Sequence, residues 1–356
     1  PFASSVDLNR SYVFNEAAVS GAAITQLGNP DISWESTTML NVGIDARFWK
    51  KFSLTAEYYI RNTSNILLTL PIPYSVGMDA PYQNAGKVRN TGWDLSIGYE
   101  DHAGDFRYGV DLVLSDVRNT IVDLKGTGPY IDGVNIRAEG YPIDAIYGYK
   151  SEGLFQTADE VQKHATQFGG LVSPGDIKYT DQNGDGVINA DDRVVLGSII
   201  PRYTYSLNLH ASYKSFDLTC FLQGVGKVDS YLSGDGVWAF YVGSTAYEWQ
   251  KNHWSPDNPD APYPRLTFGD QNNIQNSDYW MINGAYLRVK NLQLGYTLPR
   301  TLLSNTFIQN IRIWAGGQNL FTIDHFLKGF DAETPVGGIS HYPIIKVYSF
   351  GIQANF

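Results

Sequence analysis

The last residues of the chain set the strongest constraint on its fold. Every second residue from Tyr348 to Phe356 is apolar or aromatic, and the residues between them are small or polar. A period of two is that of a β-strand, whose successive side chains point to opposite faces. The strand ends the chain on an aromatic residue, so no later segment covers its apolar face. A soluble β-domain and an outer-membrane β-barrel, in which lipid solvates that face, both stay open at this point.

The composition narrows the class of protein. Of the 356 residues 14% are aromatic, with 24 Tyr, and only 17% are charged, which is low for a soluble domain. Abundant Tyr is typical of aromatic girdles at membrane interfaces and of surfaces that stack on sugars. The formal net charge of -10 argues against a nucleic-acid partner, because basic patches bind phosphates. No apolar run reaches the ~18–20 residues of a transmembrane helix, so strands would have to cross a membrane.

The same alternation recurs in hairpins along the chain. Apolar residues take every second position in 40–48 with 52–60, 93–99 with 106–114, 203–213 with 216–222, and more loosely 292–298 with 311–315. The turns near Lys50, Asp101 and Lys214 are short, whereas the connections 63–83, 117–202 and 226–283 are long. Short turns at one end and long loops at the other, outside the cell, are typical of outer-membrane barrels. We therefore predict an all-β, antiparallel transmembrane barrel.

About nine strands are predicted, counting the last one, and residues Pro1 to Ser36 are expected to be irregular. Single-chain bacterial barrels have an even number of strands, and an open edge in lipid leaves backbone groups without partners. The chain is therefore expected not to close by itself and to be the C-terminal part of a larger barrel. The absence of a signal peptide at Pro1 likewise indicates a mature fragment or the tail of a longer protein.

A segment from Asp181 to Asp192, within the long connection 117–202, fits a twelve-residue calcium-binding loop. It has oxygen-bearing residues at positions one, three and five, Gly186 at position six and an acid at position twelve. The expected ligands are Asp181, Asn183, Asp185, Val187 through its carbonyl, Asn189 and Asp192. Asp192 replaces the usual Glu, which leaves the affinity open. Because this loop would be extracellular, a structural Ca²⁺ is expected; the alternative is an Asp- and Gly-rich turn without an ion.

The connection over residues 231–280 is rich in aromatic residues. Four of them are candidate substrate-binding residues: Trp238, Tyr241, Trp249 and Trp254. Exposed rings over a lumen can stack on sugars or contact peptide side chains. The alternative is that the same rings pack the loop against its neighbours and line the membrane interface.

Two further patterns concern local structure and catalysis. Thr157-Ala-Asp-Glu160 is a capping box, which predicts a short helix through about Gln167. No G-x-S-x-G, H-E-x-x-H, P-loop or G-x-G-x-x-G motif is present, and the six His have no ligand spacing. Among 36 acidic residues, carboxylate pairs arise by chance and single out no glycosidase pair. We predict no catalytic residues and do not expect an enzyme.

Seven stretches, in order along the chain, resemble the C-terminal half of SusC-like TonB-dependent transporters, the outer-membrane nutrient importers of the Bacteroidetes. They are 29–35 (NPDISWE), 84–92 (NAGKVRNTG), 139–143 (EGYPI), 173–179 (SPGDIKY), 286–299 (YLRVKNLQLGYTLP), 317–322 (GQNLFT) and 329–333 (GFDAE). Each stretch alone is a weak signal. Their common order over nearly the whole chain is specific.

The resemblance implies a barrel of about 22 strands with a plug inside it. It also implies a SusD-like surface lipoprotein that feeds the barrel and TonB that supplies energy across the periplasm. The plug, the TonB-contacting segment and the earlier strands have no counterpart here, so the remaining N-terminal barrel and plug portion is an expected partner. Outer-membrane lipid would surround the barrel. The ligand would be an oligosaccharide or an oligopeptide, and the family leans toward glycans.

The main alternative is a passive porin or an adhesin-type outer-membrane barrel without energy coupling. Porin-type barrels rarely need an extracellular calcium loop together with an aromatic-rich loop of this length. An enzyme barrel, such as an outer-membrane lipase or protease, is a third possibility that a hydrolase assay would separate.

Overall fold

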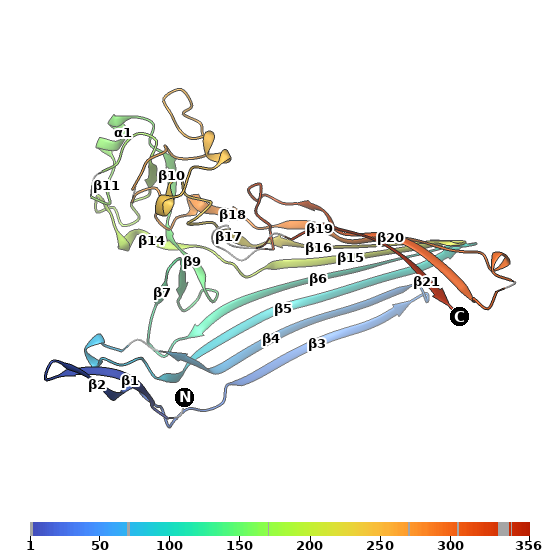
Figure 1. The fold of residues 1–356 in the computed structure, drawn as a ribbon, viewed down its shortest axis with the longest axis horizontal. Coiled ribbons are helices and arrows are strands. Elements are labelled where there is room, and N and C mark those ends of the chain that lie inside the picture. The colour runs from blue at the N-terminus through green and yellow to red at the C-terminus, as the bar shows by residue number, and fades with distance from the viewer. Residues whose placement is uncertain are drawn as a thin grey trace.

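In the computed structural model, residues 3–69, 72–169, 171–269, 271–304, 306–333, 342 and 344–356 are described. Nine strands form one antiparallel sheet, which confirms the predicted fold class and strand number (Figure 1). In spatial order they are β21 (Val347–Asn355), β20 (Asn310–Ile323), β19 (Tyr286–Thr297), β16 (Phe216–Lys227), β15 (Arg202–Tyr213), β6 (Phe106–Asp123), β5 (Tyr82–Ala103), β4 (Phe52–Thr69) and β3 (Ser36–Phe48). The expected total of about 22 strands concerns the rest of a barrel and stays a prediction.

The short turns and the long connections lie at opposite ends of this sheet (Figure 1). Residues 49–51, 104–105 and 214–215 make the short turns, as the sequence predicts. β4, β5 and β6 have 18, 22 and 18 residues, whereas about 9–11 suffice to cross the hydrocarbon layer. These strands therefore continue past the membrane toward the long connections. No helix among the described residues is long and apolar enough to span a membrane.

The register places the apolar residues on one face of all nine strands. One row of directly paired residues runs Phe48, Phe52, Tyr99, Val110, Leu209, Cys220, Leu292, Gly317 and Tyr348. The next row, on the opposite face, runs Arg47, Ser53, Gly98, Asp111 and Asn208. We call these the apolar face and the polar face. The first is the face that lipid solvates in a membrane barrel.

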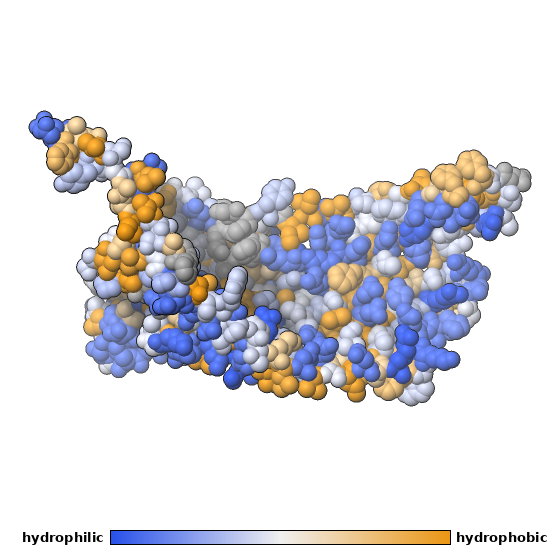
Figure 2. Space-filling model, turned by 90° about the horizontal axis from the view of Figure 1, so that it is seen from below, coloured by the Kyte–Doolittle hydropathy of each residue, from blue (hydrophilic) through white to orange (hydrophobic). Residues whose placement is uncertain are grey.

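Aromatic residues form a band on the apolar face near the short turns. Ring centroids lie 4.4 Å apart for Phe52 and Tyr99 and 4.7 Å apart for Phe216 and Tyr296. Phe106 and Tyr108 lie 5.4 Å apart in the same band. Such a band marks a membrane interface in outer-membrane barrels. In Figure 2, hydrophilic residues gather over the half of the molecule that holds the turn ends of the strands, and the surface is hollowed beside the long connections.

The two longest connections fold together into one body with its own core. This loop body comprises the described residues of 124–201 and 228–285, and it lies over the long-loop end of the sheet (Figure 1). Its strands are β7 (Tyr130–Asp132), β8 (Asn135–Arg137), β9 (Ala145–Tyr149), β10 (Ser151–Leu154), β11 (Thr166–Gln167), β12 (Ile177–Tyr179), β13 (Val187–Ile188), β14 (Arg193–Gly197), β17 (Asp229–Tyr231) and β18 (Met281–Asn283). Its core contains Ile146, Tyr149, Leu154, Ile177, Tyr179, Ile188, Tyr231, Leu232, Val237, Trp238, Trp254, Ala261 and Trp280.

Close backbone contact joins the two connections. The Tyr149 N–H donates to the Asn276 carbonyl at 2.8 Å, and a Cβ on Gly148 would lie 2.2 Å from the same oxygen. Only glycine fits there. The loop body is also attached to the polar face of the sheet. Val88, Ile121 and Leu124 form a small core with Ile143, whose N–H donates to the Asn119 side chain at 2.8 Å.

Two local predictions were wrong. Residues Pro1 to Ser36 are not all irregular, because β1 (Ser5–Phe14) and β2 (Ala17–Gln26) form a hairpin beside the sheet (Figure 1). The helix α1 (Ala158–Lys163) begins at the predicted Thr157 cap, whose hydroxyl accepts from the Glu160 N–H, but it ends before Gln167. The remaining helices are single 3-10 turns: η1 (Tyr74–Val76), η2 (Ala190–Asp192), η3 (Tyr241–Gly243), η4 (Glu248–Lys251), η5 (Asp278–Trp280) and η6 (Arg300–Leu302).

Candidate functional site

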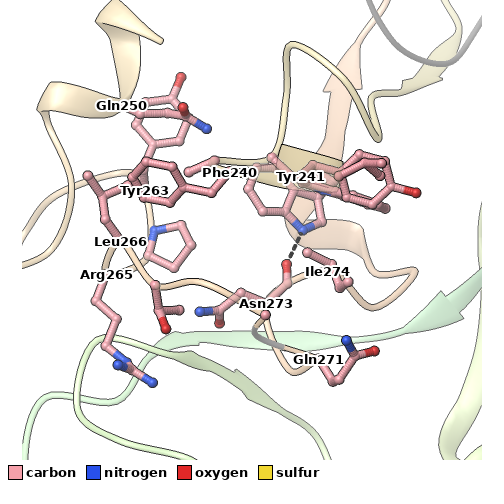
Figure 3. Close-up of a pocket in the computed structure, with 16 residues that line it drawn as sticks. Phe240, Tyr241, Gln250, Tyr263, Arg265, Leu266, Gln271, Asn273 and Ile274 are labelled. Atoms are coloured by element: carbon pink, nitrogen blue, oxygen red, sulfur yellow. Dashed lines mark hydrogen bonds between the residues drawn. The ribbon is translucent and has the colours of Figure 1, made fainter. Parts of the chain in front are cut away.

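A cavity of about 200 Å³ in the loop body is the candidate functional site (Figure 3). All of its described lining residues come from the second connection, 228–285. Ten are aromatic or apolar: Trp238, Ala239, Phe240, Tyr241, Val242, Tyr263, Pro264, Leu266, Ile274 and Trp280. The polar side chains are those of Gln250, Arg265, Thr267, Gln271 and Asn273. Ligand sites are typically apolar cavities with a few polar groups of this kind.

Hydrogen bonds fix the walls of the cavity. The Trp280 indole N–H donates to the Asn273 carbonyl at 2.8 Å, the contact drawn in Figure 3. The Gln250 amide donates to the Val237 carbonyl at 2.7 Å and accepts from the Tyr247 N–H at 2.7 Å. Because each of these groups is buried and paired, the walls are held in one arrangement.

The segment from Phe240 to Val242 has an unusual backbone. Phe240 has φ 58° and Val242 has φ 47°, in the left-handed region that a β-branched residue rarely adopts. Tyr241 lies between them, and its ring packs on the edge of Trp238 with centroids 5.1 Å apart. Strain of this kind is retained where the surrounding structure imposes it, often at ligand sites.

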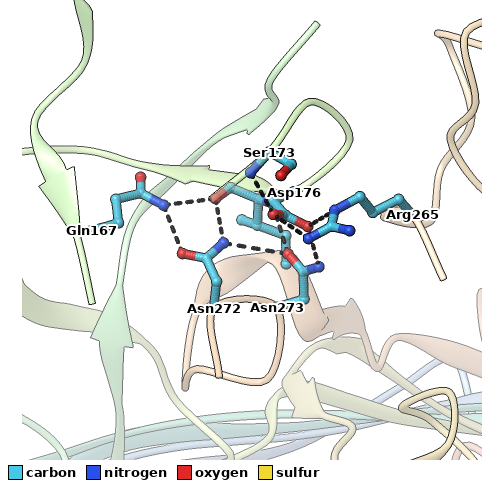
Figure 4. A network of polar contacts seen from close by, with 7 residues as sticks. Gln167, Ser173, Asp176, Arg265, Asn272 and Asn273 are labelled. Atoms are coloured by element: carbon cyan, nitrogen blue, oxygen red, sulfur yellow. Dashed lines mark hydrogen bonds and ion pairs between the residues drawn. The ribbon is translucent and has the colours of Figure 1, made fainter. Parts of the chain in front are cut away.

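A buried polar network lies behind the cavity and joins the two connections (Figure 4). The Arg265 guanidinium donates to both carboxylate oxygens of Asp176, at 2.6 and 2.9 Å, and Asp176 is fully buried. Asp176 also accepts from the Ser173 N–H and the Asn273 amide, each at 2.8 Å. Asn272 and Gln167 continue the network at 2.7 Å. The buried carboxylate of Asp176 is thus hydrogen-bonded through both oxygens and forms an ion pair with Arg265.

Burial keeps several phenols of the loop body neutral. It raises the pKa of Tyr231, Tyr263 and Tyr279 above the usual value for tyrosine. For Tyr279 the neighbouring Tyr263 adds to the effect. No Asp or Glu is among the described residues that line the cavity, and its one guanidinium is paired. The cavity therefore has neutral, largely apolar chemistry.

The structure brings together two of the four predicted substrate-binding residues. Trp238 and Tyr241 line the cavity, although only 8% of Trp238 is exposed. Trp249 stacks on Tyr247 with centroids 4.9 Å apart and planes at 7°. Trp254 belongs to the core, and its indole N–H donates to the Gln156 side chain at 2.9 Å. Packing within the loop body therefore accounts for Trp249 and Trp254.

Sequence reasoning missed most of the residues that shape the cavity. Arg265 and Asn273 are placed by Asp176, about ninety residues away in the chain. Gln250, Leu266 and Ile274 belong to no recognisable motif. The one available signal was Asp176 itself, inside the stretch 173–179 that carries the family resemblance.

The predicted calcium loop has a regular internal hydrogen-bond pattern. The Asp181 carboxylate accepts from the Gly184 and Gly186 N–H groups at 2.7 and 2.8 Å. These backbone donors, Gly186 first, lower the pKa of Asp181. Asn183 accepts from Asp185, and Asp185 accepts from Val187, at 2.9 and 2.8 Å. The loop thus gathers the oxygens of positions one, three and five on a short turn.

Asp192 and Asn189, the last two predicted ligands, accept hydrogen bonds from the backbone of the loop. Asp192 is fully buried, and its carboxylate accepts from the N–H groups of Gln182 and Asn189 at 2.9 and 2.8 Å. Asn189 caps the 3-10 turn η2 and accepts from the Asp191 N–H at 2.8 Å. Among the residues that the structure describes, no three His, Cys, Asp or Glu side chains form a group that could hold a metal ion. Asp192 closes the loop as a hydrogen-bond acceptor.

A second, polar cavity of about 370 Å³ lies on the polar face of the sheet. Its polar lining residues, from β4 and β5, are Glu57, Tyr59, Arg61, Asn90 and Asp94, and Met39 of β3 and Val117 of β6 complete the lining. The same face carries the ion pair between Arg312 of β20 and Asp217 of β16. This side of the wall is suited to water and polar solutes.

Comparison with known proteins decides the family. A model of the β-barrel of TonB dependent receptor-like proteins matches residues 3–320. The chain belongs to the TonB-dependent receptor β-barrel family. TonB-dependent receptor P3 of Formosa agariphila is 29% identical over 97% of this chain, and TonB-dependent receptor SusC of Bacteroides thetaiotaomicron is 26% identical over 92%. The solved RagAB peptide transporter is 26% identical, covers 99% of this chain and superposes with a TM-score of 0.80.

The family places this TonB-dependent receptor segment in the outer membrane and confirms the SusC-like resemblance. The chain spans 36% of the length of receptor P3, 32% of SusC and 38% of the RagAB chain. The nine strands are thus part of a barrel, and their two edges, β3 and β21, each have one neighbour in the sheet. The family is a class of receptors and transporters, not of enzymes.

Proposed function

We propose that the protein to which this chain belongs actively imports a nutrient across the outer membrane. The observation that carries the proposal is the loop body. A folded body with its own core and cavity lies over the long-loop end of a sheet whose inner side is polar. A passive pore needs no such body, whereas a receptor that captures its substrate before transport does. This segment supplies barrel wall, extracellular loops and part of the substrate cavity.

The partners follow from the proposed cycle. Substrate is captured between a SusD-like surface lipoprotein and the loop body, and TonB then acts on the plug to open a path. The plug and the remaining strands belong to the rest of the protein. The substrate is an oligosaccharide or an oligopeptide: the resemblance to SusC-like transporters implies the first, and the solved RagAB structure is that of a peptide transporter.

Uptake in living cells tests the proposal. Cells that carry the whole protein should accumulate labelled oligosaccharide or oligopeptide only when TonB is functional, and deletion of the gene should abolish uptake. Flux that persists without TonB contradicts active import and favours the porin alternative. Mild extraction from native outer membrane followed by mass spectrometry should recover a plug-bearing barrel and a lipoprotein. A chain that runs alone as a closed, heat-modifiable barrel would refute the proposal.

We also propose that the loop 181–192 binds Ca²⁺ as a structural ion. In support, Asp181, Asn183, Asp185 and the Val187 carbonyl supply the hard oxygen ligands that Ca²⁺ prefers. Asn189 and Asp192 complete the predicted ligand set, and each already accepts backbone N–H groups that close the loop. Calorimetric titration of the whole protein should show Ca²⁺ binding that Asp185→Ala weakens at least ten-fold. A calcium role is contradicted if the wild-type protein gives no binding signal and if a chelator leaves the stability of its loop body unchanged.

A further inference from the structure

We propose that the cavity in the loop body binds one apolar side chain of an oligopeptide. The inference rests on the proposed import function and selects peptide over oligosaccharide at this site. At about 200 Å³ the cavity is smaller than the ~300–1,000 Å³ typical of sites for whole drug-sized ligands. It therefore takes a part of a larger ligand, such as one side chain.

The walls favour apolar contact over sugar binding. Burial of a Leu or Phe side chain against these walls would remove its apolar surface from water and favour binding by about 1.5–3 kcal/mol. A sugar ring carries hydroxyls around its rim, and each one left unpaired in such a cavity costs about 1–3 kcal/mol. Two of the lining amides are already engaged within the protein: Gln250 by Val237 and Tyr247, and Asn273 by Asp176.

The charged groups give the same result. Arg265 donates both of its short hydrogen bonds to Asp176, and in Figure 3 its guanidinium points away from the rings of Tyr263 and Tyr241. No described lining residue is an Asp or Glu that could accept from paired sugar hydroxyls. The cavity thus offers no free charge to a ligand.

The polar groups that remain suit a peptide unit. Thr267 and Gln271 make no side-chain hydrogen bond to another described residue, and Gln271 is exposed. A hydroxyl and an amide can donate to a carbonyl and accept from an N–H. A peptide whose side chain enters the cavity would therefore find partners for its backbone beside it. The positive φ of Phe240 and Val242 presents Tyr241 at this place.

Calorimetry on the purified whole protein, with any lipoprotein that accompanies it, tests this proposal. The probes are acetyl-Gly-Leu-Gly-amide, acetyl-Gly-Ser-Gly-amide and maltotriose. We expect the Leu peptide to bind at least ten-fold more tightly than the Ser peptide, and maltotriose to leave its binding unchanged. Leu266→Trp fills the cavity and should weaken the Leu peptide at least ten-fold. The matched control is Leu302→Trp, because Leu302 is exposed in η6, on the connection between β19 and β20.

Two outcomes would overturn the proposal. If the Leu and Ser peptides bind with equal affinity, the cavity is not an apolar subsite. If maltotriose binds and Leu266→Trp abolishes its binding, the cavity is a sugar site. Because Leu266→Trp could disturb folding, heat-modifiable mobility is compared, and Ile274→Phe serves as a milder filling variant with a smaller expected loss. Uptake in cells separates this proposal from the import function. If uptake depends on TonB but the peptides bind with equal affinity, only the proposed subsite is refuted. If uptake does not depend on TonB, the import function on which the subsite rests is refuted.

Discussion

The sheet and the loop body solve the problem of apolar surface in opposite ways. In the sheet, Phe350 and Ile352 are 82% and 73% exposed, because lipid is the solvent that covers them. In the loop body, Ile146, Ile177 and Tyr179 have no exposed surface and form a conventional core. The sheet is held by backbone ladders between neighbouring strands. The loop body is held by contacts between segments far apart in the sequence, so the two regions should respond to different substitutions.

The largest expected effect breaks the loop body and spares the sheet. Asp176→Ala removes the carboxylate that pairs with Arg265 and accepts from the Ser173 N–H and the Asn273 amide. Removal of one member of a buried pair costs about 3–5 kcal/mol. We expect residues 124–201 and 228–285 to gain protease sensitivity and hydrogen exchange, while β3 to β6 stay protected.

The matched control is Asp257→Ala, at an exposed aspartate of the same body for which the structure shows no hydrogen bond. It should leave both regions unchanged. If Asp176→Ala instead loosened the sheet to the same degree, the two regions would form one cooperative unit and the comparison would fail.

The next effect breaks the sheet and spares the loop body. Leu209→Arg puts a charge on the apolar face of β15, which should cost about 2–4 kcal/mol near the bilayer midplane. Asn208→Arg puts the same side chain on the polar face, where Asn208 donates to Asp111 at 3.3 Å, and should be tolerated. Urea unfolding of the whole protein in lipid vesicles measures both. Equal destabilisation by the two variants would show that the faces are assigned wrongly.

A smaller effect sharpens the account of the polar face. Gly92 lies directly opposite Tyr59, and a Cβ there would be 2.5 Å from both the Tyr59 ring and the Asp116 carbonyl. Gly92→Ala should therefore cost about 1–3 kcal/mol through overpacking. At Gly43 the nearest atom would be 3.1 Å away, on the flexible Glu57 side chain. Gly43→Ala is the control, and its free energy of unfolding should change by no more than about 0.5 kcal/mol. Equal destabilisation by the two variants in the same urea titration would contradict the close contact at Gly92.

The difference between the regions also explains what the sequence could predict. Strands β3 to β6 alternate apolar and polar residues because each meets lipid on one side, and this local pattern gives strand, face and turn together. The hairpin β1–β2 was missed for a local reason as well. Its register shifts between Asp7 and Arg10, and β2 is rich in Ala and Gly rather than in β-branched residues.

The candidate site was beyond a local reading. Trp238 and Trp254 look alike in sequence, yet one lines the cavity and the other donates to Gln156, 98 residues away. Whether an aromatic residue meets a ligand or a neighbour depends on such distant contacts. No periodicity encodes them, so a motif search found the loop 181–192 and overlooked Arg265 and Asn273.

The last and smallest effect separates the regions by pH. Burial raises the pKa of Tyr231 in the folded loop body, whereas in the unfolded chain it is about 10. Above that pH the unfolded state loses a proton that the folded state retains, so stability falls as pH rises, by about 1.4 kcal/mol per pH unit for one such group.

Tyr231→Phe removes the group with little change in shape. Between about pH 9 and pH 11 the variant should therefore lose less loop-body stability than the wild type, as followed by urea titration and limited proteolysis. Tyr213→Phe, on the exposed rim of the sheet, should keep the wild-type slope. If both variants kept the wild-type dependence of stability on pH, the loss of stability at high pH would come from other groups. Burial of Tyr231 would then not distinguish the loop body from the sheet.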